Sequence, residues 1–345
     1  MSASSVETAN VCLASARRGT DWLLDQQTTA GNWRQLESEV YDAYYKGSWS
    51  LASAGHLDAA HRLLTHVRRT FLTPDGDLEP RLSPLHTDIA RHYSSAYVVL
   101  GAQKIDRYEI AAPALGFLLS QQDAGHGGFY SIRAQQGEPV RSDSMSTSMA
   151  GVACLAAGQT AAAVRAGDCL IRMVEMQPAP DERFYTTLDE QGRLITEFAP
   201  EMTEWRLVQA GEPKQRWFAV GLPFAFAFLL RQETGEERFS RLADWLFAFQ
   251  SRGVDPWDVP SSGKAGWACS MLYRQTGERP YRDIALRVAQ QIMGYQTPAG
   301  YFLLAPAPPG TSEPTTFAPF VYDVTAEFAL WLTLIANNVL AGDGK

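Results

Sequence analysis

Two carboxylates near the C-terminal end are spaced for acid–base chemistry. Asp323 and Glu327 are four residues apart, so they share one helical face if segment 321–341 is a helix. Neighbouring carboxylates push their pKa values apart, and a carboxyl group with a raised pKa can transfer protons near neutral pH. The pair is therefore a candidate catalytic site. Asp323 also has a simpler interpretation, as a charge that stabilises the start of the helix.

Further candidates stand near the starts of other apolar segments. Asp143 begins the Ser-rich run 142–148, where it is a candidate catalytic carboxylate or an N-cap. His92 is a candidate general acid or base, or a buried histidine with its hydrogen bonds satisfied. Lys264 lacks a phosphate-loop pattern and is a candidate contact for an oxyanion or carboxylate. The predicted substrate-binding residues are Asp42, Tyr45, Lys46, Arg216, Trp217, Lys264, Trp267 and Tyr322.

Aromatic residues fall on the same segments and suggest the nature of the ligand. In a closed ring of helices, part of the inner face must line a cavity, although aromatic residues at helical spacing more often form a core. We therefore expect a substantially apolar ligand. These aromatic residues include Trp49, Tyr93, Tyr97, Trp217, Phe218, Phe224, Trp267, Tyr322 and Trp331.

Helical periodicity runs through almost the whole chain and alternates between two types. Segment 55–72 is amphipathic, whereas segment 89–105 is apolar nearly all round, as in a helix buried on both sides. The predicted outer helices are 8–27, 55–72, 108–122, 159–177, 236–250 and 279–296. The predicted inner helices are 39–54, 89–105, 144–158, 215–233, 262–276 and 321–341. Glycines at short joints, such as Gly158 and Gly235, predict antiparallel hairpins.

A repeated pattern marks the longer loops between outer and inner helices. Its full form, basic-Gly-x-x-aromatic-aliphatic-x-x-x-Gln-x-x-x-Gly-x-Trp, spans 18–33, and weaker copies contain Gln122, Gln250 and Gln296. We expect each glutamine to satisfy backbone groups at the start of the next helix. The repeats resemble the Gln-Trp repeats of squalene-hopene cyclases and prenyltransferase-type α/α-toroids. The six-hairpin layout is similar to six-hairpin glycosidases, N-acylglucosamine 2-epimerases and linalool dehydratase-isomerase-like proteins.

The resemblance implies an all-α fold, an (α/α)6 toroid of six helical hairpins, over 1–345 as a single domain. In such a ring the inner helices begin at one mouth, where their dipoles favour oxyanions or carboxylates. Segment 178–213 interrupts the alternation of outer and inner helices. Residues 184–188 and 194–198 flank a polar turn and predict a small β-hairpin insertion, which we interpret as a flap over one end of the barrel.

Missing motifs narrow the chemistry. The Asp-rich motifs of terpenoid cyclases are absent, as are the zinc ligands of protein prenyltransferases and lanthionine cyclases. All six histidines lie in the first 126 residues, which excludes the late histidine pair expected of a 2-epimerase. The four cysteines form no metal-binding spacing, and Cys154 and Cys269 are expected to be inert packing thiols. We therefore predict no metal and no cofactor.

Composition restricts the partners and the compartment. The 345 residues carry a net charge of −8 with no basic run, which argues against nucleic acid and anionic membranes as partners. No segment has the character of a signal peptide or a membrane anchor, and the cysteine usage fits a reducing compartment. We expect a cytoplasmic protein that binds a small-molecule substrate, with homo-oligomerisation left open.

Three functions fit these features. The leading hypothesis is a cofactor-independent cyclase, dehydratase or isomerase that uses acid–base catalysis on a small, largely apolar terpenoid or polyketide-like substrate. The second is a glycan-acting hydrolase or lyase of the six-hairpin type, with paired carboxylates and aromatic platforms for sugars. The third is a toroid that binds a small molecule without catalysis. A closed apolar cavity would favour the first, and an open groove rich in hydroxyl partners the second.

Overall fold

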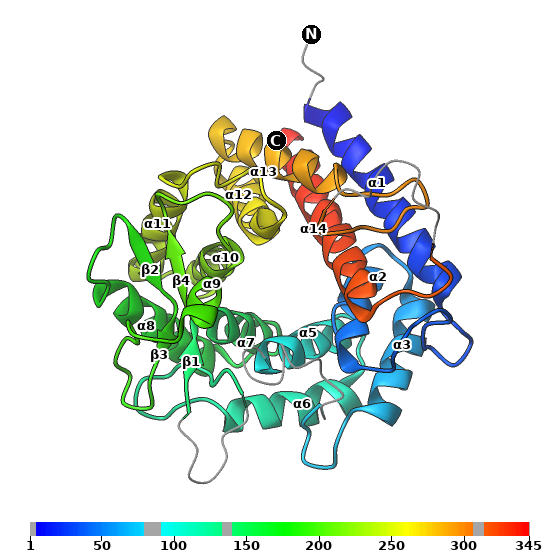
Figure 1. Cartoon of the computed structure of the whole chain (residues 1–345), viewed down its shortest axis with the longest axis horizontal. Helices are drawn as coiled ribbons and strands as arrows, with labels where there is room; N and C mark the ends of the chain where they lie inside the picture. Colours follow the sequence, from blue (N-terminus) through cyan, green and yellow to red (C-terminus); the bar gives the residue numbers. More distant parts are fainter. Residues whose placement is uncertain (1–4, 79–90, 133–139, 306–313, 345) are drawn as a thin grey trace. The chain divides into compact units, whose positions relative to one another are not determined.

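The computed structural model describes residues 5–78, 91–132, 140–305 and 314–344 (Figure 1). Helix accounts for 63% of the described residues. The chain divides into two compact units, and the division runs through helices α5, α6 and α12. The terminal unit comprises Met1–Ser83, Tyr97–Ala114 and Cys269–Lys345, and the central unit comprises Pro84–Ala96 and Leu115–Ala268. The single-domain organisation stays a prediction.

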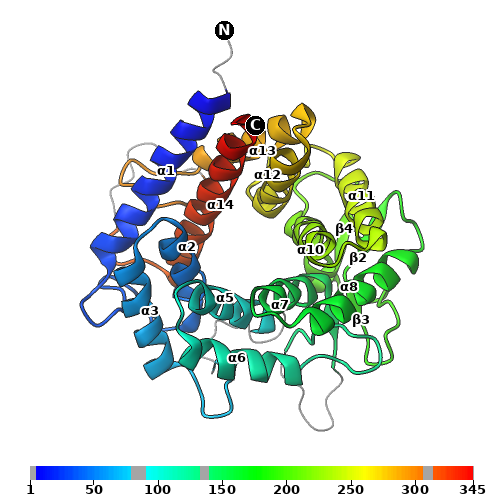
Figure 2. The ribbon, with the colours of Figure 1, turned by 180° about the vertical axis from the view of Figure 1, so that it is seen from behind.

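The terminal unit is built around α14, the longest helix that the structure describes. α14 packs against α1, α2 and α13, and both views of the ribbon show α1 alongside it (Figures 1 and 2). The unit contains α1 (Ser5–Gln26), η1 (Tyr41–Ala43), α2 (Gly47–Ser53), α3 (Leu57–Thr70), α13 (Arg279–Met293) and α14 (Pro319–Asp343). It shares α5 (Arg91–Lys104), α6 (Tyr108–Ser120) and α12 (Gly263–Thr276) with the central unit.

The central unit combines helical hairpins with two small antiparallel sheets. α7 packs against α8 and α10, and α10 packs against α11. Its helices are α7 (Ser144–Ala156), α8 (Thr160–Glu175), η2 (Pro200–Met202), α9 (Thr203–Arg206), α10 (Phe218–Thr234), α11 (Glu237–Ser251) and η3 (Pro260–Ser262). Its strands are β1 (Ser142–Asp143), β2 (Arg183–Tyr185), β3 (Thr187–Leu188) and β4 (Leu207–Gln209).

The predicted alternation of helix types is confirmed. In α3 the apolar side chains, such as Leu63 and Val67, are buried on one face, whereas every residue of α7 from Ser144 to Cys154 is buried. Each predicted segment contains a helix, with ends within a few residues of those predicted. One segment was predicted wrongly as continuous: 39–54 splits into η1 and α2. At the break, the indole of Trp33 donates to the carbonyl of Ala43 at 2.8 Å, and the N–H of Gly47 donates to Tyr44 rather than to Ala43.

The repeated glutamines bond to backbone carbonyls, but not at the start of the next helix as predicted. Gln27 donates to the carbonyl of Ala59 in the first turn of α3, and Gln122 donates to Ala162 in the first turn of α8. Gln296 donates to the carbonyls of Ser15, within α1, and Gly300, and Gln250 donates to Pro256 in its own loop. The motif is therefore structural, since three of the four amides tie the loop after one helix to the backbone of another.

The β-hairpin insertion is confirmed at its turn and wrong in its second strand. Asp189 and Arg193 close the turn through a backbone hydrogen bond, and Leu188 bridges Leu194 beyond it. Residues 195–198 form no strand. β2 pairs instead with β4, which places the buried Phe184 opposite the buried Val208 and so satisfies an apolar strand better than a half-exposed partner would. The role of 178–213 as a flap stays a prediction.

Helix α14 is long and apolar enough to cross a membrane by length and composition, but 72% of the relevant window is buried inside the protein. It also carries Asp323 and Glu327, both on the part packed within the terminal unit. We therefore describe α14 as a core helix. The absence of a membrane anchor stays a prediction.

The four cysteines give a test of the packing. All are buried and free, and burial raises the pKa of Cys12, Cys154 and Cys169 to about 12 and that of Cys269 further. Almost no thiolate therefore exists at pH 8. We expect no reaction of the folded protein with Ellman's reagent at this pH and reaction of all four thiols in guanidinium chloride. Rapid labelling of a thiol in the folded protein would contradict this packing.

Candidate functional site

A buried lysine joins the two carboxylates predicted on α14. The ammonium of Lys46 lies 2.9 Å from Asp323 Oδ2 and contacts Glu327 Oε2 as well. The side chain of Lys46 is 4% exposed, whereas those of Asp323 and Glu327 are 14% and 15% exposed. The three side chains therefore form an ion cluster whose cation is enclosed and whose carboxylates are partly exposed. We call these residues the lysine triad.

The electrostatics of the lysine triad keep Lys46 charged. Burial alone lowers the pKa of Lys46, but attraction to Asp323 and Glu327 outweighs it, so that the pKa lies above its usual range. The neighbouring phenol of Tyr45 behaves in the opposite way. Burial, then the charges of Asp323 and Glu327, raise the pKa of Tyr45 well above its usual range. At neutral pH the site thus holds an ammonium beside a neutral phenol.

Aromatic rings surround the lysine triad. The ammonium of Lys46 lies 4.9 Å from the ring centroid of Tyr45 and 5.9 Å from that of Tyr97. The indole of Trp331 donates to Glu327 Oε1 at 3.0 Å, and Trp49 packs edge-on against Trp331. Glu327 thus accepts hydrogen bonds on both oxygens, which fixes its orientation.

Local structure explains how the lysine triad is positioned. Asp323 and Glu327 lie one turn apart on α14, so they project from the same face. Lys46 is the residue before α2, at the point where the chain leaves the turn that follows η1. The break in segment 39–54 therefore places the lysine, because a continuous helix would give residue 46 a different direction.

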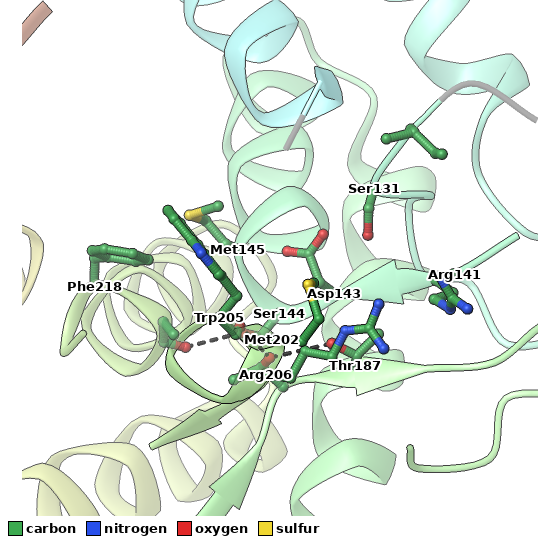
Figure 3. A pocket seen from close by; sticks show the side chains of 13 residues that line it. Ser131, Arg141, Asp143, Ser144, Met145, Thr187, Met202, Trp205, Arg206 and Phe218 are labelled. Atoms are coloured by element: carbon green, nitrogen blue, oxygen red, sulfur yellow. Dashed lines mark hydrogen bonds between the residues drawn. The ribbon is translucent and has the colours of Figure 1, made fainter. Parts of the chain in front are cut away.

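A second polar site lies in the central unit, at the start of α7 (Figure 3). Asp143 is the N-cap of α7 and accepts from the backbone N–H of Ser146 at 2.7 Å, as its N-cap interpretation predicts. Its other oxygen, Oδ2, is buried and has no hydrogen-bond partner among the described residues. Burial raises the pKa of Asp143 above its usual value, despite the opposing effects of the Ser131 side chain and of the N–H of Ser146.

Two arginines line the same pocket as Asp143. Burial lowers the pKa of Arg206, as does the nearby charge of Arg141, whereas Asp143 opposes this effect. The ring of Trp205 also lines the pocket, with the guanidinium of Arg216 stacked 3.6 Å from its centroid. The pocket therefore combines two cations, one carboxyl group and an aromatic surface. We call it the Asp143 pocket.

The structure brings some of the predicted site residues together and uses others for packing. Lys46, Asp323, Glu327 and Tyr45 form one cluster, and Asp42 is buried nearby in η1, in the same unit. Tyr322 is fully buried instead, between Trp22 and Trp33 at centroid distances of 5.1 and 5.3 Å.

The remaining predicted residues belong to the central unit. His92 is fully buried, with Nδ1 2.5 Å from the carbonyl of Tyr130. Trp217 is fully buried against Phe249. The ammonium of Lys264 lies over the rings of Tyr93 and Phe218, and Arg216 pairs with Glu204. Trp267 is buried in α12.

We predicted that these residues all lie at one open end of the ring of helices, and this placement stays a prediction. The catalytic and substrate-binding roles of the predicted residues also stay predictions.

Sequence reasoning missed Arg141, Arg206 and Trp205. The last two lie in segment 178–213, where no helical period exists, and Arg141 precedes the strand that pairs with β3. The signal available was a long polar segment, 178–213, that carries Trp205 and Arg206 side by side. Among the described residues, no group of three histidine, cysteine or acidic side chains is arranged to hold a metal ion.

Comparisons with known proteins establish the fold. No family model matches the chain, and no curated protein does. A GH76 α-mannanase of Bacteroides thetaiotaomicron matches with a TM-score of 0.64 at 14% identity, covering 94% of this chain and 95% of the mannanase. A D-mannose isomerase matches with a TM-score of 0.63 at 12% identity, over 96% of this chain and 99% of the isomerase.

A cellobiose 2-epimerase of Spirochaeta thermophila matches with a TM-score of 0.66 at 13% identity, over 96% of this chain and 98% of the epimerase. At such identities the likeness shows the fold alone. The chain has the predicted (α/α)6 toroid fold of helical hairpins. The terpenoid-cyclase resemblance gains no support from these matches.

The raised pKa of Asp143 predicts how the free energy of unfolding depends on pH. Because this pKa is raised above 3.8 in the folded protein, ionised Asp143 lowers the free energy of unfolding at neutral pH, and the penalty vanishes below about pH 3.8. Asp143→Asn keeps a capping side chain and removes the charge. We expect its melting temperature to exceed that of the wild type at pH 7, with the difference shrinking toward pH 4.

Asp143→Ala is the matched control, since it removes both the charge and the cap. Loss of an N-cap costs about 1 kcal/mol, so this variant should melt below Asp143→Asn at every pH. If Asp143→Asn and Asp143→Ala were equally destabilised at pH 7, the carboxylate would be contributing stability, contrary to its raised pKa.

Proposed function

We propose that this protein is an enzyme that isomerises or epimerises a sugar by proton transfer at the lysine triad. The solved structures of similar fold include a D-mannose isomerase, a cellobiose 2-epimerase and a GH76 α-mannanase, all named for carbohydrates. The observation that carries the proposal is the contact of one buried ammonium with two carboxylates, because it puts a base and a cationic oxyanion stabiliser side by side.

The three residues have different roles. Glu327 is a positioning residue, since its two oxygens accept from Lys46 and Trp331. Asp323 is the proton acceptor. Lys46 is the group that stabilises negative charge on the substrate oxygen, a task that its raised pKa suits because the ammonium stays protonated.

The reaction follows from these roles. Asp323 takes the proton from the carbon next to the carbonyl of an open-chain sugar, and the electron pair of that C–H bond forms a carbon–carbon double bond. The carbonyl oxygen becomes an enediolate oxygen beside Lys46. For isomerisation, the hydroxyl proton on the carbon that lost its hydrogen passes to this enediolate oxygen, and Asp323 returns its proton to the former carbonyl carbon. For epimerisation, the enediolate turns so that Asp323 returns the proton to the opposite face of the same carbon, and the carbonyl forms again. The low exposure of the site strengthens each electrostatic contact.

The geometry of the lysine triad disfavours glycoside hydrolysis at the same place. Inverting glycosidases separate their carboxyl groups by about 6.5–9.5 Å, but two oxygens bound to one ammonium lie within about 6 Å. Retaining enzymes use about 5–5.5 Å with the glycosidic bond between the two groups. Here Lys46 occupies the position between Asp323 and Glu327.

Hydrolysis of a glycan is the second candidate, and the Asp143 pocket favours it. A buried carboxyl group with a raised pKa suits a general acid, and Trp205 offers an aromatic surface to a sugar ring. One of the matched mannanases is an inactive variant with two adjacent aspartates replaced by asparagine. The present sequence contains no adjacent pair of aspartates. Asp143 would therefore act without such a neighbour.

Asp323→Asn tests the proposal. The change preserves shape and removes the proton acceptor, so we expect conversion of free sugars to fall about 100-fold or more. The measurement is product formation from D-mannose, D-glucose and cellobiose, with α-1,6-mannotriose included to detect hydrolysis. Asp21→Asn, on the exposed side of α1 in the same unit, is the matched control and should leave turnover unchanged.

Two results would count against the proposal. One is a folded Asp323→Asn variant with wild-type turnover on a sugar that the wild type isomerises. The other is mannose release from mannotriose with no conversion of any free sugar, which would favour hydrolysis instead. Circular dichroism of each variant establishes that it is folded.

A further inference from the structure

The Asp143 pocket carries more positive charge than its own residues neutralise. Arg141 and Arg206 both line it, and neither forms an ion pair with any described residue. Asp143 supplies the one carboxyl group among the lining residues. Burial and the charge of Arg141 lower the pKa of Arg206, and the nearby Asp143 offsets this effect only in part. An anionic ligand would remove this imbalance.

The pocket also offers a hydrogen-bond acceptor that the protein leaves unused. Oδ2 of Asp143 is buried without a partner among the described residues, and the residue as a whole is 8% exposed. Buried polar atoms in proteins are usually hydrogen-bonded, so a donor from a ligand or water is expected at this oxygen. Figure 3 shows the side chains of Asp143 and Arg206 projecting along the same pocket. A ligand with an anionic end and a nearby hydroxyl would satisfy both groups: the anion would pair with Arg206, and the hydroxyl would donate to Asp143.

Size restricts how such a ligand enters. The pocket is partly open, and its cavity volume is about 40 Å³, against about 10–15 Å³ for one water. The cavity therefore has room for a group as small as a carboxylate or a phosphate and not for a whole hexose. The ring must stay outside, and the apolar surfaces of Trp205 and Phe218 line the same pocket.

We propose that the Asp143 pocket binds the anionic end of a polyhydroxylated ligand, a sugar acid or a sugar phosphate. Arg206 and Arg141 hold the carboxylate or phosphate through charge-assisted hydrogen bonds, a task for which the guanidinium fork is suited. Asp143 accepts from a hydroxyl of the same molecule. The proposal concerns binding in the central unit and does not depend on catalysis at the lysine triad.

Calorimetric titration tests the proposal with defined probes. The full-length protein is titrated at low ionic strength with glucuronate, glucose 6-phosphate, glucose and inorganic phosphate. We expect glucuronate or glucose 6-phosphate to bind at least about 10-fold more tightly than glucose. Comparison of the affinities for glucuronate and glucose 6-phosphate shows whether the pocket prefers a carboxylate or a phosphate. Inorganic phosphate has no carbon-bound hydroxyl for Asp143 and should bind more weakly than the better of the two sugars.

Variants locate the binding. Arg206→Gln should weaken binding of the better anionic sugar about 10-fold to 100-fold, the usual effect of losing a charged hydrogen bond. Arg141→Gln, at an exposed residue, is a second variant with a smaller expected loss. Arg252→Gln is the matched control, because Arg252 pairs with Asp181 and does not line the pocket. It should bind as the wild type does.

Several outcomes would overturn the inference. Glucose binding as tightly as both anionic sugars would remove the role of charge. Inorganic phosphate binding as tightly as the better sugar would remove the role of the hydroxyl. Unchanged affinity in both folded Arg206→Gln and Arg141→Gln would place the ligand elsewhere. None of these results bears on sugar isomerisation, which is measured by turnover of neutral sugars.

Discussion

The enclosure of one ammonium between two carboxylates is the constraint on which the terminal unit depends. Lys46 is separated from Asp323 by 277 residues in sequence, and their contact joins the start of α2 to α14. An apolar helix such as α14 can bury two carboxylates only with a counterion. Breaking a buried ion pair by removing one partner costs about 3–5 kcal/mol, since it leaves a charge without compensation. The same contact that secures α14 therefore also fixes a base and a cation in one place.

The charge state of this cluster follows from linkage. Because the pKa of Lys46 is raised above 10.5 in the folded protein, its contribution to stability is fully present below about pH 10.5 and is lost as the pH rises through the folded value. Throughout the neutral range the ammonium is protonated. A site built in this way can stabilise a developing oxyanion without first gaining a proton, which agrees with proton transfer to a carboxylate as the chemical step.

Sequence periodicity predicted the helices well, because the difference between an amphipathic and a uniformly apolar segment is local information. The glutamine repeats were visible for the same reason, but the helices to which they bond were not. The contact of Lys46 with Asp323 and Glu327 was not, since it joins residues whose order along the chain says nothing about their distance. The break within 39–54 was also not predictable, because it accompanies a contact of Trp33 with Ala43 that helical periodicity does not report. The Asp143 pocket was missed because Arg206 ends α9, a helix of four residues that is too short to show a helical period in the sequence.

Solvent deuterium exchange tests the central role of the lysine triad most directly. A base that removes the proton beside a sugar carbonyl must exchange it with solvent in part of its turnovers. In D2O, the wild type should introduce deuterium at the carbon next to the carbonyl of D-mannose or another sugar that it converts, as seen by NMR, and this incorporation should be lost when Asp323 becomes Asn. Conversion without any exchange in the wild type, or equal incorporation in the variant, would contradict proton transfer through Asp323.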